Sequence, residues 1–104
     1  MTKPTPGPWR VVHGRNPEQF VVCTDGYEYD ASIAYLPGDY PRTALANARL
    51  IAASPELLEA LTAAERALAI AASYRPHIRA PDGDRINAAL TTARRALAKA
   101  RGEP

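Results

Sequence analysis

The residues best suited to binding a phosphorylated ligand lie around the start of the alanine-rich half of the chain. Arg42 and Arg49 are seven residues apart, a spacing that places both side chains along one edge of a helix. Arginine side chains and helix N-termini are common phosphate-binding groups. Asn47 offers an amide that could recognise a base or a ribose, and Tyr35 and Tyr40 offer rings on which a base could stack. These five residues are the predicted ligand site.

Each of these residues also has an ordinary structural interpretation. Arg49 could pair with Glu56 or with a carboxylate on a strand, and Asn47 could cap a helix or bridge to a sheet edge. The tyrosines could simply cover a sheet face. Trp9, the single tryptophan, is expected to anchor the core rather than to bind a ligand.

The sequence indicates no catalytic chemistry. It holds no H-E-x-x-H zinc motif, no P-loop, no nucleophile elbow and no dinucleotide-binding glycine pattern. His13 and His77 lie in different segments, Ser54 suits a helix cap, and Cys23 suits a buried structural position. The single cysteine excludes an intrachain disulfide, and three or four closely spaced metal ligands are not present. We therefore expect a protein that is not an enzyme and needs no metal or cofactor.

The first part of the chain predicts a small antiparallel sheet. Residues 1–8 alternate proline with other residues, which favours an extended arm over a paired strand. Residues 9–13 and 19–23 are β-type runs. Asp25-Gly26 is a typical hairpin turn, and residues 27–35 alternate as a half-solvated strand that places Ile33 and Tyr35 on one face. We expect a three-stranded meander over residues 9–35.

The second part predicts three helices. They cover residues 41–53, 55–74 and, after a cap at Asp84, the chain up to Arg101. Ser54 is expected to cap the second helix, and Gly102 is a typical C′ residue. The seam of the last two helices, which should form an antiparallel hairpin, is Leu57, Leu61, Ala64, Leu68 and Ala71 against Ile86, Leu90, Ala93, Leu97 and Ala100.

The fold class is thus α+β: a small antiparallel three-stranded sheet followed by three helices, in one domain over residues 1–104 with its helical part at 41–101. A seam that is half alanine buries little apolar area. We therefore expect a homo-oligomer whose interface uses Leu50, Leu58 and Ile70, although single exposed apolar residues are also common on monomers.

Charge and hydropathy restrict the partners. The formal net charge is only +2, so nonspecific binding to nucleic acid is not expected. Arg94, Arg95, Lys99 and Arg101 form a mild basic stripe on the last helix, which leaves a weak DNA-binding regulator as one alternative. No run of about 18 apolar residues and no signal peptide occur, so we expect no membrane partner and a cytoplasmic location.

Three segments carry a resemblance. Residues 5–9 (TPGPW), residues 46–61 (ANARLIAASPELLEAL) and residues 93–100 (ARRALAKA) are similar to segments of small bacteriophage and prophage proteins. The layout, with strands first and helices behind, also resembles phage anti-defence proteins that act as sponges for cyclic nucleotide signals. The resemblance implies a non-catalytic phage accessory protein, and its sharpest version is a sponge for a cyclic or ADP-ribose-type nucleotide. The alternative is a protein-binding inhibitor or structural module that acts through its helix surface.

Overall fold

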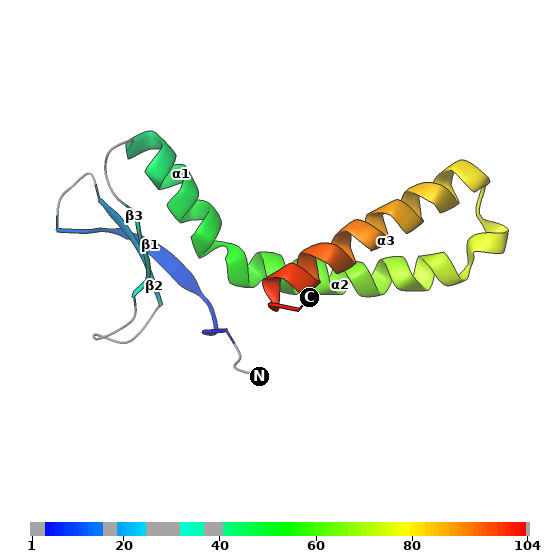
Figure 1. Cartoon of the computed structure of the whole chain (residues 1–104), viewed down its shortest axis with the longest axis horizontal. Helices are drawn as coiled ribbons and strands as arrows, with labels where there is room; N and C mark the ends of the chain where they lie inside the picture. Colours follow the sequence, from blue (N-terminus) through cyan, green and yellow to red (C-terminus); the bar gives the residue numbers. More distant parts are fainter. Residues whose placement is uncertain (1–3, 16–18, 25–31, 37–40, 104) are drawn as a thin grey trace. The chain divides into compact units, whose positions relative to one another are not determined.

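The computed structural model describes residues 4–15, 19–24, 32–36 and 41–103. The chain divides into two compact units, Met1–Leu57 and Leu58–Pro104. The first unit holds the sheet, one helix and the first turn of the next helix, and the second holds a helical hairpin (Figure 1). The α+β class and the element order predicted from the sequence are confirmed, while folding as a single domain stays a prediction.

The sheet consists of β1 (Trp9–His13), β2 (Phe20–Thr24) and β3 (Ser32–Leu36) in the order β1-β2-β3, and both pairs are antiparallel (Figure 1). β1 has the predicted bounds and β2 is displaced by one residue. Between them, the Gly14 N–H donates to the Gln19 carbonyl at 2.8 Å. The predicted Asp25-Gly26 turn and the start of the third predicted strand lie outside the described residues.

Helix α1 (Pro41–Ala52) covers one face of this sheet. The core between them contains Phe20 and Val22 of β2 and Ala44 and Ala48 of α1, and Val22 is fully buried. Because Ala44 and Ala48 are small, the helix backbone can approach the strands closely. Packed around this centre are partly buried apolar residues: Trp9, Val11, Ile33, Ala34, Leu36, Leu45, Ile51 and Ala52. The structural role predicted for Trp9 is confirmed, since it packs against this core.

The third strand departs from strict alternation. The register between β2 and β3 is irregular at Val22/Cys23, since Val22 lies opposite Ala34 whereas Cys23 lies opposite Ser32. A bulge of this kind shifts which side chains share a face. Ile33 is half-buried, yet Tyr35 is 76% exposed, so the prediction that they lie on one face is wrong. Cys23 itself is buried and its thiol is free.

The junction between α1 and α2 (Ser54–Ser73) also differs from expectation. The Ser54 hydroxyl donates to the Leu50 carbonyl at 3.3 Å, and the Leu57 N–H donates to the Ala53 carbonyl at 2.9 Å. Helical hydrogen bonding therefore continues across Ala53. An N-cap side chain would accept a hydrogen bond from the amide of Leu57, three residues after Ser54, but this amide already donates to a backbone carbonyl. The prediction that Ser54 caps a new helix is wrong, because the preceding chain is already helical.

The second unit pairs the remainder of α2 with α3 (Ala80–Ala100) as an antiparallel hairpin, and a short 3₁₀ turn, η1 (Arg75–His77), connects them. α3 begins four residues before the predicted cap at Asp84, and its N-cap is Arg79. Pro81 falls in the first turn, where a missing N–H does no harm, and the Gly83 N–H donates to the Arg79 carbonyl at 2.9 Å. The expected loop over residues 76–83 is therefore partly helix.

The end of α3 confirms the prediction for Gly102. This glycine has a φ of 72°, in the left-handed region. Its N–H donates to the Lys99 carbonyl at 3.1 Å, and the Glu103 N–H donates to the Ala98 carbonyl at 2.8 Å. These two bonds form a Schellman motif, in which a C′ glycine satisfies the last helical carbonyls.

The predicted seam of the hairpin is confirmed in part on both helices. On α3, Ile86 is half-buried and Ala100 is exposed, which corrects the prediction for Ala100. Leu90, Ala93 and Leu97 are buried. Every residue of α2 is described and none is fully buried, and Leu57 and Ala64 of the predicted stripe are exposed. The half-buried residues of α2 in this unit include Leu61, Leu68 and Ala71 of the predicted stripe and, outside it, Leu58, Glu65 and Ala72.

Candidate functional site

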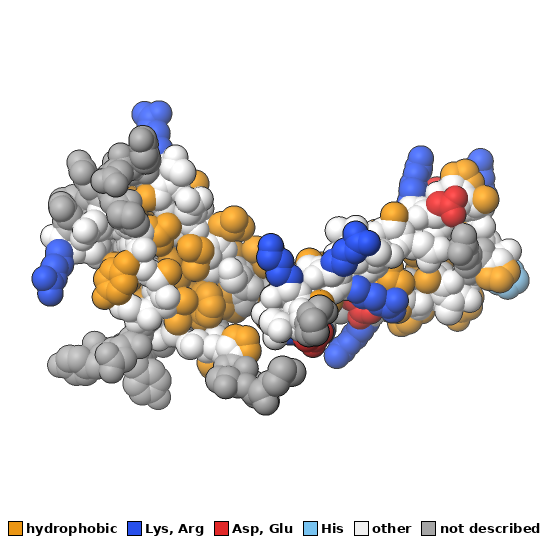
Figure 2. All heavy atoms as spheres, viewed as in Figure 1, with side chains coloured by type: hydrophobic (Ala, Val, Ile, Leu, Met, Phe, Trp, Pro, Cys, Tyr) orange, Lys and Arg blue, Asp and Glu red, His pale blue; other side chains and the backbone are white. Residues whose placement is uncertain are grey.

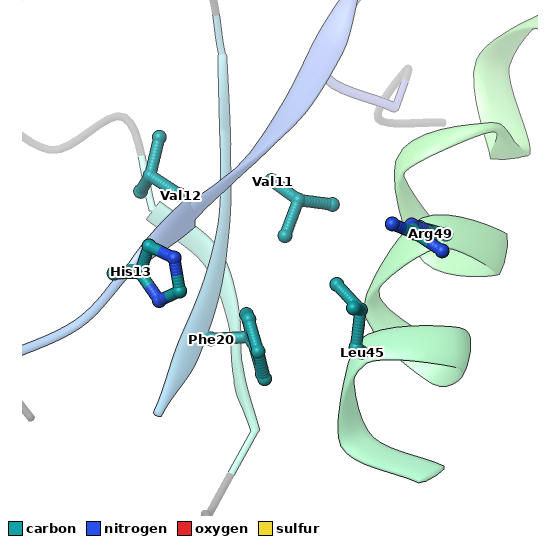
Figure 3. Close-up of a pocket in the computed structure, with 6 residues that line it drawn as sticks. All are labelled: Val11, Val12, His13, Phe20, Leu45 and Arg49. Atoms are coloured by element: carbon teal, nitrogen blue, oxygen red, sulfur yellow. The ribbon is translucent and has the colours of Figure 1, made fainter. Parts of the chain in front are cut away.

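An open groove lies between β1 and α1 in the first unit (Figure 3). It has a volume of about 350 Å³ and six lining residues. Figure 2 shows that hydrophobic side chains gather over the sheet and α1 on the face in view. The groove is lined by Val11, Val12 and His13 of β1, Phe20 of β2, and Leu45 and Arg49 of α1.

Local rules place these side chains together. Leu45 and Arg49 are one helical turn apart and therefore share a side of α1. Val11 and Phe20 point into the space between the strands and this side of the helix (Figure 3). His13 lies opposite Phe20 in the strand register, with their ring centroids 5.2 Å apart and tilted by 39°. The walls are mostly apolar.

Three consecutive residues of β1 line the groove. Consecutive residues of a strand point to opposite faces of a sheet, yet Val11, Val12 and His13 all contribute to the lining. The strand β1 itself therefore borders the groove, and not only the side chains of one face. In the sheet of the described residues, β1 pairs with β2 along one edge and with no strand along the other.

Arg49 supplies the positive charge of the groove. Within the residues that the structure describes, its guanidinium forms no ion pair and no hydrogen bond. Glu56, which the sequence offers as a partner, does not pair with it. An arginine in this state retains its full capacity to bind a carboxylate or a phosphate with two parallel hydrogen bonds.

The predicted ligand residues do not converge in the described part of the chain. Arg42 is exposed on the same edge of α1 as Arg49 but does not line the groove. Asn47 is exposed and lies about 200° around the helix from Arg49. Tyr35 lies on β3, beyond β2, opposite Val21 in the register. Tyr40 lies outside the described residues. A ligand-binding role for each of these residues stays a prediction.

Sequence reasoning found Arg49 and missed the rest of the groove. In the sequence His13 is a candidate only for catalysis or metal binding, while Val11, Phe20 and Leu45 are core or strand residues in the sequence pattern. The signal that could have found them is the position of residues 9–13 as the first strand of a meander. A first strand lies at the edge of such a sheet and can border a helix that packs on it.

A second hollow of about 370 Å³ lies at the turn of the helical hairpin, lined by Pro76, Ile78, Ala80 and Gly83. No ionisable side chain lines it. In the described ranges, no group of three or more His, Cys, Asp or Glu residues is placed to hold a metal ion. Among those same ranges, no helix has the length and hydropathy needed to cross a membrane.

The chain belongs to a family of bacteriophage proteins. The matching family model is described as Salmonella phage P22 protein Y8K6 and covers residues 1–104. This match confirms the phage resemblance seen in the sequence at the level of the family. No curated protein and no solved structure matches the chain.

Proposed function

We propose that this phage protein is a non-catalytic accessory protein that binds an acidic segment of another protein in the groove between β1 and α1. The observation that carries the proposal is the guanidinium of Arg49, which has no ion-pair or hydrogen-bond partner among the described residues and lies beside a mostly apolar lining. One positive charge next to aliphatic walls matches a ligand with one carboxylate and neighbouring apolar side chains.

A nucleotide ligand fits this groove less well. Cyclic and ADP-ribose-type nucleotides carry several phosphate oxygens and a base, which call for several donors and a stacking surface. The rings of His13 and Phe20 line the groove, but it offers a single guanidinium in place of several donors, and Asn47 and Tyr35 lie on other surfaces. The nucleotide sponge therefore ranks second, and it is separated from the protein-binding function by the experiment below.

A DNA-binding role has less support. Arg94 pairs with Glu65, the Nε–Oε1 distance being 3.0 Å. Figure 2 shows Lys and Arg side chains at several separate places along the helical hairpin. Nucleic-acid binding uses basic groups gathered into a stripe or patch, which the hairpin does not display on the face in view.

The test compares the full chain with two variants in a selection from a random peptide display library. We expect enrichment of peptides that combine an acidic residue with apolar residues. Loss of a charge-assisted hydrogen bond costs about 1.5–3 kcal/mol, so Arg49→Ala should weaken binding by about 10-fold to 100-fold. Arg42→Ala, on the same helix edge but outside the groove, is the matched control and should bind as the wild type does.

Two further measurements test the nucleotide and DNA alternatives. Native mass spectrometry of the protein purified from cells that produce nucleotide signals would detect a retained nucleotide. A retained nucleotide that is lost in Arg49→Ala, together with no enriched peptide, would favour the sponge. DNA retention that falls steeply with salt, again with no enriched peptide, would favour the regulator.

A further inference from the structure

We infer that the bound segment joins the sheet as a fourth strand along the outer edge of β1. This inference rests on the proposed function and specifies how the same groove recognises its partner. Strand addition is a common mode of peptide recognition, in which main-chain hydrogen bonds give affinity and pockets for alternate side chains give specificity.

The first observation is the position of β1 in the sheet. Within the described residues β2 is the one strand paired with β1, so no described strand lies along the other side of β1. Such an edge is a template for another extended chain. Its five residues match a ligand segment of about the same length.

The two edges of the sheet are not equivalent. β1 pairs with β2 in an uninterrupted register from Trp9↔Thr24 to His13↔Phe20. The pairing of β3 with β2 is irregular between Val22 and Cys23, and bulges of this type are a common means of blocking edge pairing. The regular edge is thus also the one beside the groove, which points to β1 as the docking edge.

The walls of the groove define the side chains of the ligand. An added strand presents alternate residues to one face, so the residues at positions i and i+2 would both face α1. Val11, Phe20 and Leu45 form an apolar surface for one of these two ligand side chains. Arg49 lines the same groove and would bind a carboxylate on the other. The inferred motif is an extended segment with an apolar residue and an acidic residue two positions apart.

The decisive experiment is a backbone N-methyl scan of the peptide most enriched on the full chain. N-methylation removes one amide donor without changing the side chains. If the peptide pairs with β1, methylation at every second position should weaken binding by about fivefold or more, and the intervening positions should tolerate it. In hydrogen exchange, saturating peptide should protect amides of residues 9–13 and leave those of residues 32–36 unchanged.

The possible failures are distinguishable. If the peptide binds in an Arg49-dependent manner but tolerates N-methylation at all positions, strand addition is wrong and the proposed function stands. If no peptide binds, the proposed function fails and this inference fails with it. If residues 9–13 become protected on raising the protein concentration without peptide, the edge pairs with a second copy of the chain, and the inference of a foreign segment is overturned.

Discussion

Gly7 lies directly against Pro55, so that a Cβ atom added at Gly7 would lie 2.8 Å from the Pro55 Cβ. The residues belong to two of the three segments that carry the phage resemblance, TPGPW at 5–9 and the block at 46–61. The indole Nε1 of Trp9 donates to the Pro6 carbonyl at 3.2 Å within the same arm. The two recognisable motifs are therefore in contact, which gives their co-occurrence a packing explanation.

Substitution at Gly7 tests this contact. Gly7→Ala must displace the rigid ring of Pro55, and we expect a loss of about 1–3 kcal/mol in the free energy of unfolding. The measurement is denaturant unfolding of the full chain followed by circular dichroism. Thr5→Ala, an exposed position on the same arm, is the control and should change the stability by less than about 0.5 kcal/mol. Equal stability of Gly7→Ala and wild type would refute the close approach.

A second matched pair tests the contact of α1 with the sheet. Ala48 is fully buried against the core, whereas Ala46, two residues earlier, is exposed. Ala48→Leu adds three carbon atoms to a filled space and should destabilise the protein by about 1–3 kcal/mol. Ala46→Leu should be close to neutral. If Ala46→Leu lowered the urea midpoint of unfolding more than Ala48→Leu does, α1 would pack through its other side.

The ion pair between Arg94 and Glu65 should contribute little to stability. Glu65 is half-buried and Arg94 is more exposed, and exposed pairs contribute about 0–1 kcal/mol. Arg94→Ala should therefore lower the free energy of unfolding by up to about 1 kcal/mol, and less at high salt. Arg95→Ala, with no ion pair among the described residues, is the control. A larger loss that is insensitive to salt would point to packing instead.

Self-association remains a prediction, and the exposure of the three predicted interface residues shows which of them can be tested on the surface. Leu50 and Ile70 are each 63% exposed, whereas Leu58 is half-buried within its own chain. Light scattering should give a mass above that of one chain for the wild type. Leu50→Glu or Ile70→Glu should reduce that mass, while Leu58→Glu should mainly destabilise the hairpin. A wild-type mass equal to one chain at all concentrations would contradict the homo-oligomer.

Local signals predicted most of the fold. The β-type run at residues 9–13 and the glycine at 102 gave correct positions because each depends on its own neighbours in sequence. The start of α3 was missed because Pro81 and Gly83 are typical of loops, although a first helical turn accepts both. The exposure of Tyr35 was missed because a bulge is set by pairing with another strand.

The candidate site was less predictable for the same reason. Arg49 stands out in the sequence because arginine is a typical anion-binding residue. The groove around it joins residues from β1, β2 and α1, and only the tertiary packing brings Val11, Phe20 and Leu45 next to Arg49. The spacing of Arg42 and Asn47 along one helix does not reveal which side of that helix the sheet covers.

The burial of Cys23 has a practical consequence for studying this protein. Its thiol is the only one in the sequence and is enclosed within β2. A cysteine introduced at an exposed position in each unit, such as Arg42 and Thr91, would therefore react with a fluorescent dye well before Cys23 does. Energy transfer between the two dyes would then measure how far apart the sheet unit and the hairpin lie in solution.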